Sequence, residues 1–165
     1  MLSEKFQEII RDNSAGNHSR AAIRWAMLVG PRQEWDHKRI LCNARKRPCP
    51  TIPRCKETIT LCGMCFDCDV PSNIHYGYLG LVAGFSSETL IVAPGVVQKP
   101  PHWPLDDSRD SNAIELGIQL ALFEGYPWRL PMLRTNSLCA FVTGQVTGPL
   151  QPAPKICAPC PFFGP

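Results

Sequence analysis

Three glycines, two tyrosines and a histidine share one short segment of this chain, Ser72-Asn73-Ile74-His75-Tyr76-Gly77-Tyr78-Leu79-Gly80-Leu81-Val82-Ala83-Gly84-Phe85. Glycine adopts backbone conformations closed to other residues and lets another part of the chain approach closely. A histidine gains or loses a proton near neutral pH, so it can exchange protons with a substrate. We therefore expect this segment to form part of a functional site. The residues alone leave a second interpretation open, in which the histidine packs against core aromatics.

The composition around this segment indicates one small globular domain. A chain of 165 residues suits a single core, and its 44 % hydrophobic and 19 % charged residues argue against wholesale disorder. Apolar residues recur more clearly at helical spacing than at strand spacing. The sequence predicts an α-rich α+β fold over residues 1–126, with an irregular Cys/Pro-rich insert at 42–68. Residues 127–165 are rich in proline and are expected to be a disordered tail.

The spacing of apolar residues predicts several helices and one short strand. The helices run over residues 2–12 with Ser3 as N-cap, 20–28 with Ser19 as N-cap, from Ser86 or Ser87 to 97, and over 112–123 with Gly125 as the stop. Pro94 is expected to kink or stop the third of these helices. The predicted strand covers Thr58–Leu61 within the insert.

Nine cysteines fall in two clusters, at residues 42–68 and 139–160. The chain starts without a signal-peptide core, and no apolar run reaches the roughly 20 residues that span a bilayer. We therefore expect reduced thiols or a metal site rather than a disulfide framework, and either a cytoplasmic location or export without a signal peptide. Two Cys-x-x-Cys pairs could bind zinc, but they lie far apart in the sequence, so we assign no metal or cofactor. These pairs are Cys62 with Cys65 and Cys157 with Cys160.

The positive charge of the chain is concentrated in one stretch. The formal net charge is +3, yet eight Lys or Arg and only two acids lie between Arg32 and Lys56. This stretch therefore carries +6 (8 − 2) and the rest of the chain −3 (3 − 6). It could steer an anionic partner such as RNA or DNA, or it could be a solvated loop.

The basic stretch includes Trp35-Asp36-His37-Lys38, which places an acid, an imidazole and an ammonium beside a large aromatic. In an extended conformation alternate side chains share a face, so Asp36 and Lys38 point one way and His37 the other. Such side chains carry general acid–base chemistry. The competing interpretation is a surface turn anchored by Trp35.

A second acidic group, Asp106-Asp107-Ser108-Arg109-Asp110, precedes the clearest predicted helix. Its carboxylates could bind a divalent metal or place a base beside a cation. Capping by Asp107 or Asp110 and the helix dipole explain at least one of them without any function.

The order of these three groups along the chain resembles the bacterial toxin 44 family of polymorphic toxins, which also has members in fungi. The resemblance covers about residues 25–123, and it has no counterpart for the cysteine-rich insert or the tail. It implies a toxin domain, often the C-terminal part of a secreted toxin, proposed to be a ribonuclease and countered by a cognate immunity protein. The positions that match the polar motifs of the family are Asp36, His37, Lys38, His75, Tyr76, Asp106, Asp107 and Asp110.

Ribonuclease chemistry without a metal needs a base, an acid and a cation. His75 as base, His37 as acid and Lys38 as cation would fill these roles. The predicted catalytic set is completed by Asp36, Asp107 and Asp110. The residues expected to bind the RNA, by stacking or by hydrogen bonds, are Tyr76, Tyr78, Trp35, Arg39 and Asn73.

Two other functions stay open at this point. Asp36 or Asp107 with His75 could hydrolyse another polymer, such as bacterial cell wall. A non-catalytic binding module, stabilised by zinc on the cysteine pairs or left from an inactive copy, would also fit the composition. The sequence predicts no membrane association and leaves the oligomeric state open.

Overall fold

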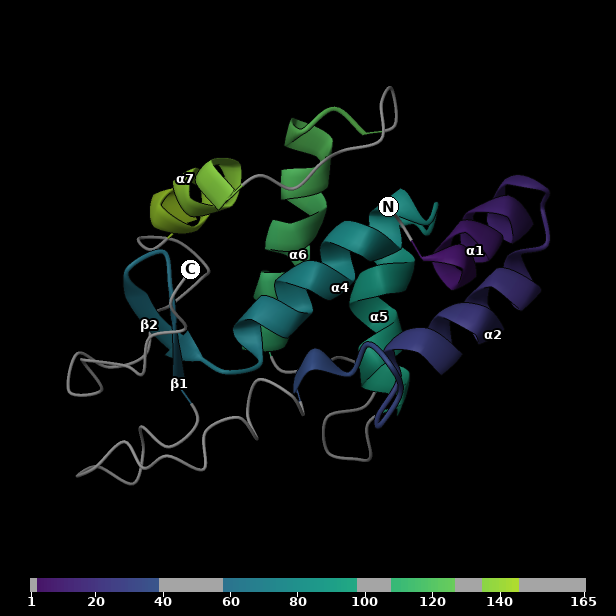
Figure 1. Ribbon diagram of the computed structural model, residues 1–165, viewed down its shortest axis with the longest axis horizontal. Coiled ribbons are helices and arrows are strands. Elements are labelled where there is room, and N and C mark those ends of the chain that lie inside the picture. Colours follow the sequence, from purple (N-terminus) through teal and green to yellow (C-terminus); the bar gives the residue numbers. More distant parts are fainter. Residues whose placement is uncertain (1–2, 39–57, 98–107, 127–134, 146–165) are drawn as a thin grey trace.

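Two helices that cross at glycines form the centre of the protein. The computed structural model describes residues 3–38, 58–97, 108–126 and 135–145. Helix α4 (Val70–Val82) carries most of the glycine-rich segment, and α6 (Ser108–Phe123) packs across it (Figure 1). A Cβ on Gly77 would lie 2.0 Å from the carbonyl oxygen of Ile114, and one on Gly117 would lie 2.0 Å from that of Ile74. The two backbones are therefore in direct contact.

The sequence pattern did not predict α4, because several glycines lower the helix propensity of the segment. Gly77 and Gly80 instead permit close approach, since a Cβ on Gly80 would lie 2.3 Å from the side chain of Leu90. Gly84 follows the helix with φ of +90°, in the left-handed region that favours glycine. The two expected roles of glycine, close approach and a left-handed backbone, therefore both occur, but within a helix and just after it.

Helices α1 (Glu4–Ser14) and α2 (His18–Val29) pack against each other at one end of the molecule (Figure 1). The hydroxyl of Ser3 accepts the backbone N–H of Phe6, which confirms the predicted cap. Helix α2 begins earlier than predicted, and its N-cap residue is Asn17 instead of Ser19. Asn13 ties this pair to the end of α4 by donating a hydrogen bond of 2.9 Å to the carbonyl of Ala83.

Helix α5 (Ser87–Val97) follows the turn at Gly84. Its start is as predicted, since the hydroxyl of Ser86 accepts the backbone N–H of Thr89. The helix continues past Pro94, so the prediction of a stop there is wrong. Proline removes one intrahelical hydrogen bond but keeps a helical φ, and the helix tolerates that loss here.

A small hairpin lies at the end of the molecule opposite α1 and α2 (Figure 1). Strand β1 (Thr58–Leu61) is as predicted, and it pairs antiparallel with β2 (Met64–Asp67), which we did not predict. Cys62 and Gly63 form the turn, with φ of 53° and 77°. Two successive residues with positive φ match the right-handed twist of the strands.

The structure at this end of the molecule corrects two predictions, one about the C-terminal tail and one about the cysteines. Helix α7 (Thr135–Gln145) lies within the segment expected to be a disordered tail. A disulfide joins Cys62 to Cys139 of α7, and Cys65 and Cys68 are also disulfide-bonded, so these thiols are not free for zinc. The turn brings Cys62 to α7 in three dimensions, which residue spacing could not reveal. Cys157 and Cys160 lie outside the described residues.

The architecture is an α-rich α+β fold in one small domain, as predicted. One hydrophobic cluster joins α1, α2, α4, α5 and α6, and a smaller one joins the hairpin, α4, α6 and α7. Within the described parts of the chain, no helix has the length and apolar character needed to cross a membrane.

Candidate active site

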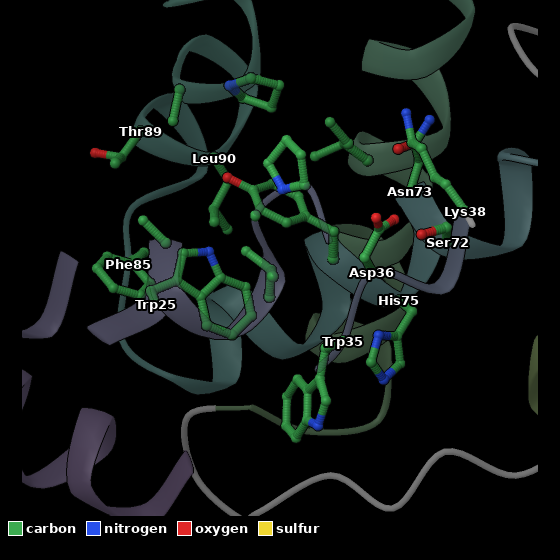
Figure 2. Close-up of a pocket in the computed structure, with 18 of the residues that line it drawn as sticks. Trp25, Trp35, Asp36, Lys38, Ser72, Asn73, His75, Phe85, Thr89 and Leu90 are labelled. Carbon is green, nitrogen blue, oxygen red and sulfur yellow. The ribbon is translucent and has the colours of Figure 1, made fainter. Parts of the chain in front are cut away.

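A cavity of about 390 Å³ opens where α2, α4 and α5 meet the segment that follows α2. Figure 2 shows that it has two unlike sides. Lys38, Asn73 and Ser72 lie on one side, and the carboxylate of Asp36 extends between them and the centre of the view. Trp25, Phe85 and Leu90 lie on the other side. Two of the segments that the sequence singled out, residues 35–38 and 72–85, therefore contribute to one pocket.

Two histidines from distant parts of the sequence are in contact at this site. The rings of His37 and His75 lie edge to face, with centroids 4.7 Å apart and an interplanar angle of 78°. The ring of Trp35 also contacts His75, with centroids 5.7 Å apart, and is itself packed against Phe6 of α1 at 5.5 Å. The aromatic neighbours thus fix the position of the His75 ring.

The surroundings of His75 keep its imidazole neutral. Burial, and secondly the nearby His37, lower the pKa of His75 to about 4. At neutral pH the ring therefore has a lone pair that is available to accept a proton. A bound anion would favour the imidazolium form and raise this pKa again.

A hydrogen-bonded group connects the ends of α4 and α6 to the segment after α2. The carboxylate of Asp110, in the first turn of α6, is 3.2 Å from the ammonium of Lys38. Its other oxygen accepts a hydrogen bond of 2.7 Å from the amide of Asn73. Asp110 therefore orients Lys38 and Asn73 at the pocket, besides any effect on the helix dipole.

The carboxylates of Asp36 and Asp69 add negative charge near Lys38 and Asp110. Asp36 accepts a hydrogen bond of 2.7 Å from the backbone N–H of Arg32. Burial, and then repulsion by Asp110, raise the pKa of Asp69, while Lys38 acts in the opposite direction. The rim of the pocket is thus not strongly cationic, because Lys38 is shared among carboxylates.

Most of the predicted site residues that the structure describes come together, with one exception. Trp35, Asp36, Lys38, Asn73, His75 and Tyr76 line the pocket, and His37 and Asp110 contact members of this set. Tyr78 does not line it: its side chain is 3 % exposed and donates a hydrogen bond of 2.8 Å to Glu124. Burial and this bond raise the pKa of Tyr78. Tyr78 follows the pocket-lining Tyr76 by two residues, so it lies on the other side of the helix and points into the core. The expected contact with RNA does not fit this buried position. Arg39, Asp106 and Asp107 lie outside the described residues.

Sequence reasoning missed the apolar side of the pocket. Trp25 and Leu90 are buried residues on helices, and in a sequence such residues look like ordinary core positions. The available signal was the run of alanines on α2, because Ala22 and Ala26 lie on one face one turn apart and leave space beside Trp25.

Across the four described segments, no group of three or more His, Cys, Asp or Glu side chains is arranged to hold a metal ion. Of the cysteines that the sequence analysis weighed as zinc ligands, Cys62 and Cys65 are in disulfides.

The sequence was also compared with known proteins. No curated protein and no solved structure matches the chain. The family described as bacterial toxin 44 matches residues 24–122, a segment that contains both histidines, Lys38, Asp110 and the residues that line the pocket except Ala22. Since this match covers more than half of the 165 residues, the chain belongs to the bacterial toxin 44 family and carries a toxin domain.

Proposed function

We propose that this toxin domain is a ribonuclease that cleaves RNA by general acid–base chemistry. The observation that carries the proposal is the contact of His37 and His75 beside a pocket rimmed by Lys38 and Asn73. A neutral imidazole supplies the base that phosphodiester cleavage needs, and a second imidazole in its protonated, imidazolium form supplies the acid. As a toxin domain, the chain would have a cognate immunity protein as partner.

In the proposed reaction His75 takes the proton of the ribose 2′-hydroxyl. The 2′-oxygen attacks the adjacent phosphorus, the bond from phosphorus to the 5′-oxygen breaks, and His37 gives that oxygen a proton. The products are a 2′,3′-cyclic phosphate and a free 5′-hydroxyl. Because the ring centroids are 4.7 Å apart, no phosphate fits between them. His75 would act from the pocket that it lines, and His37 from its place beside His75. Proton exchange with water then restores both histidines.

Lys38 and Asn73 would stabilise the charge of the phosphorane. Asp110 holds both of them, so their positions are set before RNA binds. The basic stretch continues directly from Lys38 along the chain and supplies further positive charge for the RNA backbone.

The test is cleavage of total RNA by the purified protein in the presence of EDTA. We expect the wild-type protein to degrade RNA and His75→Gln and His37→Gln to lose at least about 100-fold in rate, the range of general acid–base catalysis. His18→Gln is the matched control, because His18 is exposed on α2 and does not line the pocket. Intact RNA with a folded wild-type protein would refute the proposal.

A second candidate is a hydrolase of another polymer, such as bacterial cell wall. It is favoured by the carboxylates around Lys38, since Asp36 and Asp110 outnumber the ammonium at the rim. Asp36 with His75 would then activate a water molecule. Clearing of a cell-wall suspension by the wild-type protein but not by Asp36→Asn, with RNA left intact, would identify this activity.

A further inference from the structure

The pocket has an apolar side that the acid–base chemistry does not use. It lies opposite Lys38 and Asn73 in Figure 2. Trp25 packs against Tyr76 and Phe85 there, with ring centroids 5.6 and 5.7 Å apart. Flat aromatic surfaces of this kind are those on which nucleobases stack in proteins that bind single strands.

The space beside these rings is large enough for a small ring system. The whole cavity measures about 390 Å³, within the range of roughly 300–1,000 Å³ that encloses small organic ligands. Alanines keep it open, because Ala22 and Ala26 from α2 and Ala93 from α5 line it where larger side chains would fill it. The same cavity continues to the polar rim.

The indole N–H of Trp25 favours a ligand that accepts a hydrogen bond on the apolar side of the pocket. Trp25 is 6 % exposed, and its Nε1 has no hydrogen-bond partner among the described residues. A buried donor without a partner costs roughly 1–3 kcal/mol. In Figure 2 this nitrogen is on the ring edge that faces Leu90, another lining residue. A ligand that moved the end of the Leu90 side chain could accept the bond.

We propose that the apolar side of the pocket holds one unstacked base of a single-stranded RNA, a proposal that rests on the proposed ribonuclease function. A base offers both a flat face to stack and ring or carbonyl acceptors for the indole N–H. With the base beside Trp25 and Phe85, its ribose lies toward His75 and its phosphate toward Lys38. A base in a duplex is held in the stack, so double-stranded RNA is a poor substrate.

The experiment measures binding without cleavage. The probes are fluorescent 2′-O-methyl RNA hexamers of each base type, which lack the attacking hydroxyl, and a hexamer with abasic central positions. We expect the wild-type protein to bind the preferred base type at least about tenfold more tightly than the abasic hexamer, as stacking in such sites predicts. Ala26→Leu fills the pocket and should remove this difference. Ser19→Leu adds the same side chain at an exposed position of α2 outside the pocket and should keep it.

The outcomes separate this proposal from the proposed function. If Ala26→Leu, still folded, binds and cleaves RNA like the wild-type protein, no base enters the pocket, while the ribonuclease stands. If the wild-type protein cleaves no RNA but binds the hexamers in a way that Ala26→Leu abolishes, the pocket binds bases and the ribonuclease proposal falls. Equal affinity for the abasic and the base-containing hexamers overturns the inference, whatever the cleavage result.

Discussion

At the scale of single residues, His75 and Tyr78 show how one helix serves both the site and the core. His75 faces Trp35 and His37 at the pocket, whereas Tyr78 turns inward to Glu124. Tyr78 is buried and His75 is partly buried, and burial shifts each pKa in the direction that disfavours the charged form. The residue types could be selected from the sequence, but the direction of each side chain required knowing that the segment is a helix.

The burial of His75 predicts a specific dependence of stability on pH. Its pKa is about 4 in the folded protein and 6.5 ordinarily. Between these values the unfolded state binds more protons, so the stability that His75 contributes is present above pH 6.5 and is lost as pH falls toward 4. From pH 7 to pH 5 the free energy of unfolding should fall by about 2 kcal/mol more in the wild-type protein than in His75→Gln. Urea unfolding at both pH values measures this, and equal losses would show that His75 is not buried.

At the scale of secondary-structure elements, the crossing of α4 and α6 positions the site. It places Asn73 of α4 and Asp110 of α6 within hydrogen-bond distance, and Lys38 then joins Asp110. The spacing of apolar residues predicted the end of α6 at Phe123, two residues before Gly125, because the pattern is sustained up to there. The helix starts at Ser108, four residues earlier than predicted. It could not predict α4, because the glycines that lower helix propensity are there for close packing against α6.

The crossing of α4 and α6 predicts that alanine substitutions at two helical glycines have very different effects on stability. Gly117→Ala places a Cβ 2.0 Å from the carbonyl oxygen of Ile74 and should destabilise the protein by about 3 kcal/mol or more. Gly144→Ala is the control, because nothing lies within 4 Å of its Cβ position in α7. It should be neutral or stabilise by up to about 1 kcal/mol. Thermal unfolding of both variants checks this, and similar melting temperatures for the two would contradict the close crossing.

At the scale of the whole molecule, the features that the sequence left open are contacts between segments that lie far apart along the chain. The order of the polar motifs predicted that the three groups share a site, and the described members do meet. Composition indicated an α-rich domain, but it did not reveal the disulfides or helix α7. A disulfide between residues 77 positions apart depends on how the hairpin turn and α7 meet, and no local pattern records that.

The Cys62–Cys139 disulfide predicts a change in stability without a change at the site. It joins the hairpin to α7, away from the pocket-lining residues. Removing it in the double variant Cys62→Ser with Cys139→Ser should lower the free energy of unfolding by about 2–4 kcal/mol, since the bond restricts a long loop of the unfolded chain. RNA cleavage at a temperature where the variant is folded should be unchanged. Urea unfolding with parallel rate measurements tests both parts, and an unchanged unfolding midpoint would argue against the bond.

The central claim is that the His37–His75 pair cleaves RNA at this pocket. The most direct measurement is mass spectrometry of the ends produced from a defined single-stranded RNA in EDTA. The proposed reaction predicts fragments that end in a 2′,3′-cyclic phosphate and start with a 5′-hydroxyl, formed by the wild-type protein and by His18→Gln. The same fragments should be reduced at least about 100-fold with His75→Gln and His37→Gln. An uncut RNA, or equal cleavage by all four proteins, would contradict the claim.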